Sequence, residues 1–385
     1  MNTPKKADGL LRRTLSERVV IADGAMGTML QAANPSLADF QNHEGCNEIL
    51  NVSRPDIVRS VHDEYLAAGV DAIETNTFGA NWSNLADYGI EDRIYELAFA
   101  GGKIAREAAD AFSKPDKPRF VLGSLGPGTK LPSLGHTTYD NLKLAYYTAA
   151  KGLADSGCDA LLVETSQDLL QVKAAVNGCR EAINEAAHDI VLIAQVTVET
   201  TGTMLMGSEI GAALNALEPM GIDLIGLNCA TGPAEMSEHL RYLSKNANIG
   251  ISVMPNAGLP QLGPNGATYP LNPDELATAL DGFVTDYGIS LVGGCCGTTP
   301  AHLASVVAKL SKRKISQRTP ALDPGASSLY QYVPFRQDQT YLAIGERTNA
   351  NGSRAFRDAL LAEDWEKCVE IARDQIRDGA HMLDL

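Results

Sequence analysis

Three cysteines that follow apolar segments could bind a metal ion. Cys295 and Cys296 are adjacent and lie between Gly294 and Gly297, and Cys229 ends an apolar run much earlier in the chain. A solitary cysteine in such a place is usually a buried, inert thiol, and an adjacent pair could instead form a redox disulfide. Glycines on both sides, however, let the backbone leave strand geometry so that both sulfurs of the pair can face one point. The sequence therefore predicts a three-cysteine cluster.

This cluster would favour Zn²⁺. Thiolate ligands suit zinc better than magnesium or manganese, and structural zinc is normally closed by four protein ligands, often in C-x-x-C pairs. The sequence contains no C-x-x-C pair. Three thiolates leave one position open, as in catalytic zinc sites, but they make the ion a poor Lewis acid for water. The same ion can bind and deprotonate a further thiol, so the pattern indicates alkyl transfer to sulfur.

Eight short apolar runs alternate with amphipathic stretches, and these elements must position the cysteines. The runs cover residues 19–22, 70–74, 120–123, 160–164, 190–196, 224–227, 249–253 and 290–292. Residues 55–68 form one of the helical patterns, with a proline at its start and a glycine after its end. Buried strands that alternate with helices in this way favour a parallel sheet closed into a (β/α)8 TIM barrel. The alternative is a doubly wound open sheet, but the first turn, DGAMGT, lacks the GxGxxG pattern.

Polar side chains collect at the carboxyl ends of the predicted strands, where a barrel has its active site. Asp23 follows the first strand, Glu74 the second and Glu164 the fourth. Asp23 or Glu74 alone could equally be a helix cap. Cys229 follows the sixth strand and the Cys295–Cys296 pair the eighth. One strand separates the two, a gap of about 9 to 10 Å that inward side chains and two Zn–S bonds can span.

Composition and charge exclude several classes of protein. The chain has 385 residues, 44% of them hydrophobic, and a net charge of −15, which opposes nucleic-acid binding as its main role. No apolar run reaches the 18 residues of a membrane helix, and the first residues do not resemble a secretory signal. Seven cysteines are too sparse for a disulfide framework. We therefore expect a cytoplasmic protein with no membrane or nucleic-acid partner.

The periodic pattern stops after the eighth unit. We expect a barrel over residues 1–312 and a linker rich in Pro, Ser and Gly over 313–340. A second α/β segment should occupy 341–385, with a strand from Tyr341, a helix over 355–377 and another strand from His381. Forty-five residues are too few for an independent core. This segment is therefore expected either to dock on the barrel or to be the truncated start of a second α/β barrel.

Over Leu15 to Leu310 the sequence resembles the homocysteine S-methyltransferase family, through DGAMGT, GLNC, PNAG and GGCCGTTP in that order. The resemblance implies a zinc ion held by the three cysteines and bound by the thiol of homocysteine. It assigns the substrate ammonium to Asp23 and Glu164, and the substrate carboxylate to backbone N–H groups at Gly24 and Ala25. Asn256 becomes a candidate fourth zinc ligand without substrate. Ser166 departs from the larger apolar residue of many relatives.

Residues 341–385 resemble the first strand and helix of the methyltetrahydrofolate-binding barrel in the cobalamin-dependent methionine synthase family. That resemblance implies that zinc-bound homocysteine thiolate accepts a methyl group from methylcobalamin to give methionine, with methyltetrahydrofolate as the ultimate donor. Glu346 in the IGER strand end becomes a candidate pterin-binding residue. The remainder of that barrel and the cobalamin module lie outside this sequence, so both modules are expected partners.

Two alternatives remain open at this stage. One is a stand-alone homocysteine methyltransferase that uses S-methylmethionine or betaine, although the segment after Tyr341 argues against it. The other is a non-catalytic zinc-binding barrel that serves as an interaction scaffold.

Overall fold

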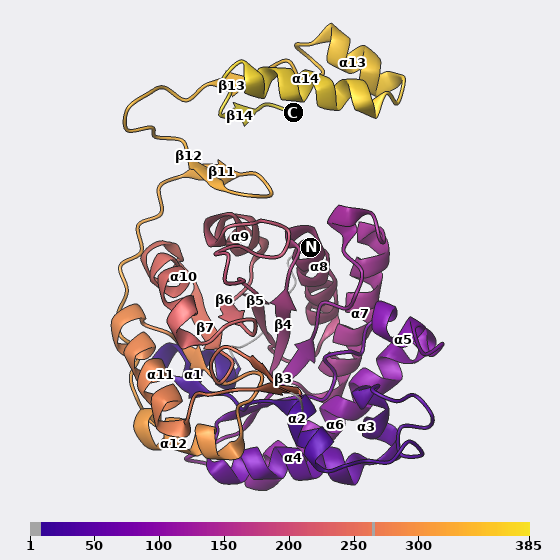
Figure 1. Ribbon diagram of the computed structural model, residues 1–385, viewed down its shortest axis with the longest axis vertical. Helices are drawn as coiled ribbons and strands as arrows, with labels where there is room; N and C mark the ends of the chain where they lie inside the picture. The colour runs from indigo at the N-terminus through magenta and orange to yellow at the C-terminus, as the bar shows by residue number, and fades with distance from the viewer. Residues whose placement is uncertain (1–8, 264–265) are drawn as a thin grey trace. The chain divides into compact units, whose positions relative to one another are not determined.

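The computed structural model describes residues 9–263 and 266–385. These form two compact units, one extending to Ala321 and the other covering Leu322–Leu385, and each is described by itself. Figure 1 shows the barrel of the first unit, with its helices on the outside of the strands. No described helix is both long and apolar enough to cross a membrane.

The first unit is a (β/α)8 barrel, which confirms the predicted fold. Its eight strands are all parallel and pair in the order β1-β10-β7-β6-β5-β4-β3-β2. The strands are β1 (Val20–Ile21), β2 (Ala72–Glu74), β3 (Phe120–Leu125), β4 (Ala160–Ser166), β5 (Val191–Val196), β6 (Leu224–Asn228), β7 (Gly250–Met254) and β10 (Leu291–Val292). Each strand lies within a residue or two of a predicted apolar run.

One long helix follows each strand before the next begins. These helices are α4 (Pro55–Ala68), α6 (Ile94–Phe112), α7 (Tyr139–Ser156), α8 (Leu169–Glu185), α9 (Ile210–Leu217), α10 (Pro233–Asn246), α11 (Pro273–Tyr287) and α12 (Pro300–Leu310). Helix α4 has the predicted bounds, because Pro55 starts it and Gly69 ends it with a φ of +102°.

Shorter elements decorate the loops of the barrel. They are α2 (Met26–Ala32), α3 (Leu50–Ser53), α5 (Trp82–Ala86) and four single-turn 3₁₀ helices over 47–49, 91–93, 132–134 and 218–220. An antiparallel hairpin, β8 (Gln261–Gly263) and β9 (Gly266–Thr268), follows β7. This hairpin lies outside the predicted alternation of strands and helices.

Aspartate side chains join the two strands at which the barrel closes. The N–H of Asp71 donates to the carbonyl of Ile21 at 2.7 Å, and the Asp71 carboxylate accepts the N–H of Ile21 at 3.0 Å. Arg18 forms an ion pair with the same carboxylate. At the carboxyl end, both oxygens of Asp23 accept the N–H of Glu74, each at 3.1 Å. Asp23 therefore helps to close the barrel between β1 and β2.

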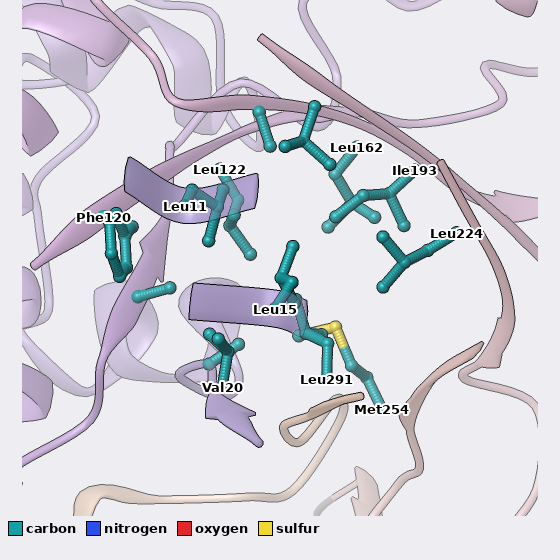
Figure 2. Packing of buried hydrophobic residues seen from close by; sticks show 14 residues of the cluster. Leu11, Leu15, Val20, Phe120, Leu122, Leu162, Ile193, Leu224, Met254 and Leu291 are labelled. Atoms are coloured by element: carbon teal, nitrogen blue, oxygen red, sulfur yellow. The ribbon is translucent and has the colours of Figure 1, made fainter. Parts of the chain in front are cut away.

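Helix α1 (Leu10–Glu17) closes the opposite end of the barrel. Leu11 and Leu15 of this helix pack among the inward side chains of the strands, as Figure 2 shows. Arg12 fixes the helix, because its guanidinium forms ion pairs with Asp189 at 2.9 Å and with Asp223. The inward side chains in this cluster include Val20, Phe120, Leu122, Leu162, Ile193, Leu224, Met254 and Leu291. Helix α1 thus covers one end of the apolar interior, and the polar residues lie at the opposite, open end.

Part of the predicted linker contacts the barrel. Arg318 donates to the carbonyl of Ala247 at 2.8 Å, and Ala321 N–H donates to Lys245 at 2.9 Å. The second unit begins with an antiparallel hairpin inside the predicted linker, formed by β11 (Gly325–Ser327) and β12 (Tyr332–Pro334).

The rest of the second unit has a short parallel pair of strands and two helices. The pair is β13 (Ile344–Gly345) with β14 (Met382–Leu383). The single helix predicted over 355–377 is wrong, because the chain forms α13 (Arg354–Leu361) and α14 (Trp365–Arg377). Glu363 adopts a φ of +55°, which no α-helix tolerates, and Asp364 then caps α14 by accepting the N–H of Lys367.

His62 of α4 should make the barrel sensitive to acid. It is fully buried, neither ring nitrogen has a hydrogen-bond partner in the described part of the chain, and burial lowers its pKa from 6.5 to about 3. Between these pH values the unfolded chain binds a proton that the folded chain does not. The free energy of unfolding therefore decreases by about 1.4 kcal/mol for each unit by which the pH is lowered within this window.

We expect His62→Leu to lose about 2 kcal/mol less stability than the wild type between pH 7.5 and pH 5. Urea denaturation at the two pH values measures this difference. His136→Leu, at an exposed position, is the control and should behave as the wild type. An unchanged pH dependence in His62→Leu would show that another group causes the acid sensitivity.

Candidate metal and substrate site

A cavity of about 400 Å³ opens at the carboxyl ends of the strands. Its wall combines sulfur, carboxylate and amide groups from strand ends that are far apart in the sequence. The wall includes Gly24, Ala25, Glu74, Ser124, Glu164, Thr165, Asn228, Cys229, Cys295 and Cys296. The polar residues that the sequence places at the rim therefore line one cavity together with the cysteines.

The structure brings the three predicted cysteines together. Their sulfur atoms all lie within 4.8 Å of one another, and Cys229 Sγ is 3.9 Å from Cys296 Sγ. All three residues are partly buried. Among the described residues, this is the one group of cysteine, histidine or acidic side chains close enough to hold a metal ion.

Hydrogen bonds to the end of β7 hold the Cys295–Cys296 turn in place. Cys295 N–H donates to the carbonyl of Pro255 at 2.8 Å, and Cys296 N–H donates to Asn256 Oδ1 at 3.1 Å. Ala257 N–H returns a bond to the carbonyl of Cys296 at 3.0 Å. Asn256 thus lies beside the cysteines, and its side-chain oxygen accepts a backbone N–H of the turn.

The glycines around the pair serve two different purposes. Gly297 adopts a φ of +78°, so there the conformational freedom of glycine is used. Gly294 is needed for space instead, because a Cβ there would lie 2.4 Å from Thr298 Oγ1. From the sequence alone, all of these glycines were expected to provide conformational freedom. In the structure, Gly294 is required by tight packing instead.

The three thiols share protons unequally. Hydrogen bonds from Cys229 and Cys295 lower the pKa of Cys296 to about 3. Contacts with Cys229 and Cys296 raise the pKa of Cys295 well above that of a free thiol. The cluster therefore favours a thiolate at one position even with only its own thiols as partners.

Two carboxyl groups face the cavity and a third lies behind them. Glu74 and Glu164 are part of the wall, whereas Asp23 is fully buried and accepts the backbone N–H of Glu74. Sequence reasoning gave Glu74 no role beyond a strand end or a helix cap, although its place after the second strand was a usable signal. Glu74 therefore lines the cavity, whereas Asp23 is buried between β1 and β2 and binds the backbone of Glu74.

Burial dominates the electrostatics of these acids. It raises the pKa of Glu164 to about 7, and it raises the pKa of Asp23 and of Glu74 well above the usual range. Mutual repulsion with Glu164 adds to the rise at Glu74. Three buried acids with raised pKa values favour a cationic ligand. A nearby positive charge lowers their pKa values and so stabilises the ionised carboxylates.

Two neutral side chains orient Glu164. Ser124 Oγ donates to Glu164 Oε1 at 2.5 Å, and Asn228 Nδ2 donates to Oε2 at 3.1 Å. Both donors follow predicted strands, but sequence reasoning assigned no role to either. Their donation could not be foreseen, since it depends on how the ends of the nearby strands β3, β4 and β6 align in the barrel.

The remaining predicted residues have definite places. Gly24 and Ala25 line the cavity, and Ala25 N–H donates to Thr298 Oγ1 at 3.2 Å. Ser166 is buried at the end of β4. Glu346 belongs to the second unit, where its exposed side chain borders a hollow beside Gln375.

Comparisons with known proteins identify the family of the barrel. The family model described as "Homocysteine S-methyltransferase" matches residues 20–310. A methionine synthase of Mycobacterium tuberculosis is 62% identical over 371 residues, which are 96% of this chain and 31% of that protein. A methionine synthase of Mycobacterium leprae is 59% identical over 97% of this chain and 32% of its own length. The chain thus spans about a third of the length of these relatives.

Solved structures show the same fold. The metallated form of the homocysteine methyltransferase MmuM from Escherichia coli matches 77% of this chain and 99% of its own, with a TM-score of 0.63 and 24% identity. Its oxidized form matches with a TM-score of 0.59 and 23% identity. With a family model that covers nearly the whole barrel, the chain belongs to the homocysteine S-methyltransferase family.

Proposed function

We propose that Cys229, Cys295 and Cys296 bind Zn²⁺, and that the cavity above them binds homocysteine for methylation at sulfur to give methionine. The observation that carries this proposal is the meeting of three sulfurs and two carboxyl groups, those of Glu74 and Glu164, in one cavity. A thiol-bearing amino acid has a sulfur that could bind at the cysteine cluster and an ammonium group that could bind at the carboxyl groups.

The cysteine cluster fits zinc in geometry and in chemistry. Two sulfurs at about 2.3 Å from a tetrahedral zinc ion are about 3.8 Å apart, and Cys229 Sγ and Cys296 Sγ are separated by 3.9 Å. Three sulfur donors favour zinc over magnesium, calcium or manganese. When bound, zinc supplies a positive charge that lowers the pKa of a further thiol and so provides a nucleophilic sulfur at neutral pH.

The residues of the chain bind and orient the substrate. Glu164 and Glu74 would accept the substrate ammonium, and Asp23 supports Glu74 by holding its backbone N–H. The loop at Gly24 and Ala25 remains the proposed place of the substrate carboxylate. In the reaction the thiol loses its proton, a carbon–sulfur bond forms, and the bond between the donor and its methyl group breaks.

The methyl donor is proposed to be methylcobalamin, with methyltetrahydrofolate as the ultimate source. Support comes from residues 341–385, whose sequence resembles the start of a methyltetrahydrofolate-binding barrel, and from the relatives named methionine synthase. Those relatives are about three times as long as the matched segment. In this proposal the cobalamin module lies outside this chain, and Glu346 contributes to the pterin site.

Cysteine substitutions test the zinc site. We expect Cys296→Ala to reduce bound zinc from about one ion per chain to less than about a tenth, since one of three ligands is lost. Methylation of homocysteine by added methylcobalamin at pH 7 should fall more than about thirtyfold, because a free thiol is only a few per cent ionised. Elemental analysis and a methionine assay measure the two effects.

Cys179→Ala is the matched control, because Cys179 is a buried thiol of α8 that is not among the residues lining the cavity. It should keep both zinc and activity. The same assay with S-methylmethionine and betaine tests the donor, and turnover with either one but not with methylcobalamin would overturn the donor proposal. Zinc that is retained in Cys296→Ala would contradict the site itself.

The pKa of Glu164 predicts how binding depends on pH. Methionine, the product, has no titrating thiol, so its binding isolates the carboxyl group. Since the pKa of Glu164 is about 7, the group is protonated at lower pH and must lose a proton to bind the ammonium. We expect the Kd of methionine to rise up to about tenfold per unit as pH decreases below 7.

Isothermal titration calorimetry between pH 5.5 and 8 measures this dependence. Glu164→Gln should bind methionine weakly at pH 8 and should show a flatter pH profile, because the titrating group is gone. A profile of the same steepness in Glu164→Gln would assign the titration to Glu74 or Asp23 instead.

A further inference from the structure

Asn228 joins the two ends of the cavity. It is the last residue of β6, it is almost completely buried, and it directly precedes Cys229. Its Nδ2 donates to Glu164 Oε2 at 3.1 Å and to Thr165 Oγ1 at 2.8 Å, and its Oδ1 accepts Thr165 N–H at 2.7 Å. One side chain therefore connects the carboxylate end of the wall to the strand that carries a sulfur.

The segment that Asn228 holds is a bulge in β4. Pairing with β5 passes from Val163 opposite Ala194 to Ser166 opposite Val196, so two residues of β4 face one of β5. Thr165 adopts a φ of +54°, which is unfavourable for a β-branched residue. The bulge leaves Thr165 N–H outside the strand ladder, and Asn228 Oδ1 accepts it.

A second strained turn begins directly after Asn228. Cys229 has a φ of +58° and Ala230 a φ of +55°, so two consecutive non-glycine residues are left-handed. Thr197 Oγ1 donates to the backbone carbonyl of Asn228 at 3.2 Å and fixes the start of this turn. Strained conformations of this kind persist only where the surrounding contacts hold them. Asn228 is the side chain that ties the strained turn at Thr165 to the one at Cys229.

We propose that Asn228 is a positioning residue that sets the spacing between the Glu164 carboxylate and the Cys229 sulfur, and thereby selects homocysteine over cysteine. This inference rests on the proposed function, because it takes the substrate ammonium to lie at Glu164 and the substrate sulfur at the cysteine cluster. Cysteine is one methylene shorter than homocysteine. With both anchors fixed, the shorter amino acid can reach one of them but not both.

The size of the expected preference follows from general experience. One methylene changes binding about 10- to 200-fold where a site is rigid. Loss of a hydrogen bond to a charged group costs roughly a factor of ten or more in affinity. Removal of the Asn228 amide should therefore weaken homocysteine binding and also reduce the preference, since the bulge at Thr165 becomes free to move.

The test compares Asn228→Ala with the wild type, both loaded with zinc. Isothermal titration calorimetry gives the Kd of L-homocysteine and of L-cysteine, and elemental analysis gives the zinc content. We expect homocysteine to bind about tenfold or more weakly and the preference over cysteine to shrink by at least fivefold. The zinc content should remain that of the wild type, because all three cysteines are intact.

Gln171→Ala is the matched control. Gln171 is an almost completely buried amide whose Nε2 donates to the backbone carbonyls of Pro127 and Lys130 rather than to Glu164 or Thr165. This variant should lose thermal stability and keep the wild-type preference. An equal loss of preference in Gln171→Ala would show that any buried amide has the effect, and would overturn the positioning role.

Two further variants separate positioning from general stability. Asn228→Leu keeps the branched shape of the side chain but can neither donate to Glu164 nor accept from Thr165, so it should restore part of the packing lost in Asn228→Ala and not the preference. In a double-mutant cycle, Asn228→Ala should add little to the effect of Glu164→Gln on homocysteine binding. Additive effects, or a preference restored in Asn228→Leu, would overturn the inference.

The outcomes also distinguish this inference from the function on which it rests. A wild-type chain that holds zinc but does not bind homocysteine contradicts the proposed function. A wild-type chain that prefers homocysteine, together with an Asn228→Ala variant that keeps this preference, contradicts only the role of Asn228.

Discussion

Three sulfur atoms within 4.8 Å of one another can come from β6 and β10 only if the backbone bends sharply where both strands end. The bend at Cys229 uses a left-handed residue, and the bend at Cys295–Cys296 uses Gly297 and close packing at Gly294. The closed barrel makes this meeting possible, because it places the carboxyl ends of its parallel strands on one rim. The cavity, its carboxyl groups and their partners are arranged around this point.

The other end of the cavity depends on burial. Burial raises the pKa of Glu74, Glu164 and Asp23, so their charged forms are disfavoured until a cation arrives. Neutral donors hold Glu164 in position without neutralising it, since Ser124 and Asn228 carry no charge. Such a wall can distinguish a zwitterionic amino acid from a simple thiol. Apolar packing around α1 closes the opposite end of the barrel and leaves the rim as the open face.

Sequence reasoning predicted the strands, the order of the motifs and the convergence of the three cysteines. These features follow from local patterns, because the type and spacing of apolar runs, glycines and cysteines can be read directly from the sequence. It placed Glu74 on the rim without a role in binding, it assigned no role to Ser124 or Asn228, and it expected one helix where α13 and α14 are separated at Glu363. The roles of these residues depend on contacts between distant parts of the sequence. A Glu, Ser or Asn at the end of a strand is too common to indicate a binding role by its type alone.

The sequence by itself determined the eightfold alternation of strands and helices and the set of sulfur ligands available to a metal. Only the tertiary structure decided which carboxyl group faces the cavity. Asp23 follows β1 in the most conspicuous motif, yet both its oxygens accept the N–H of Glu74, between β1 and β2 at the two ends of the strand order. That bond joins residues of two strands separated by a long loop and a helix, so only closure of the barrel creates it.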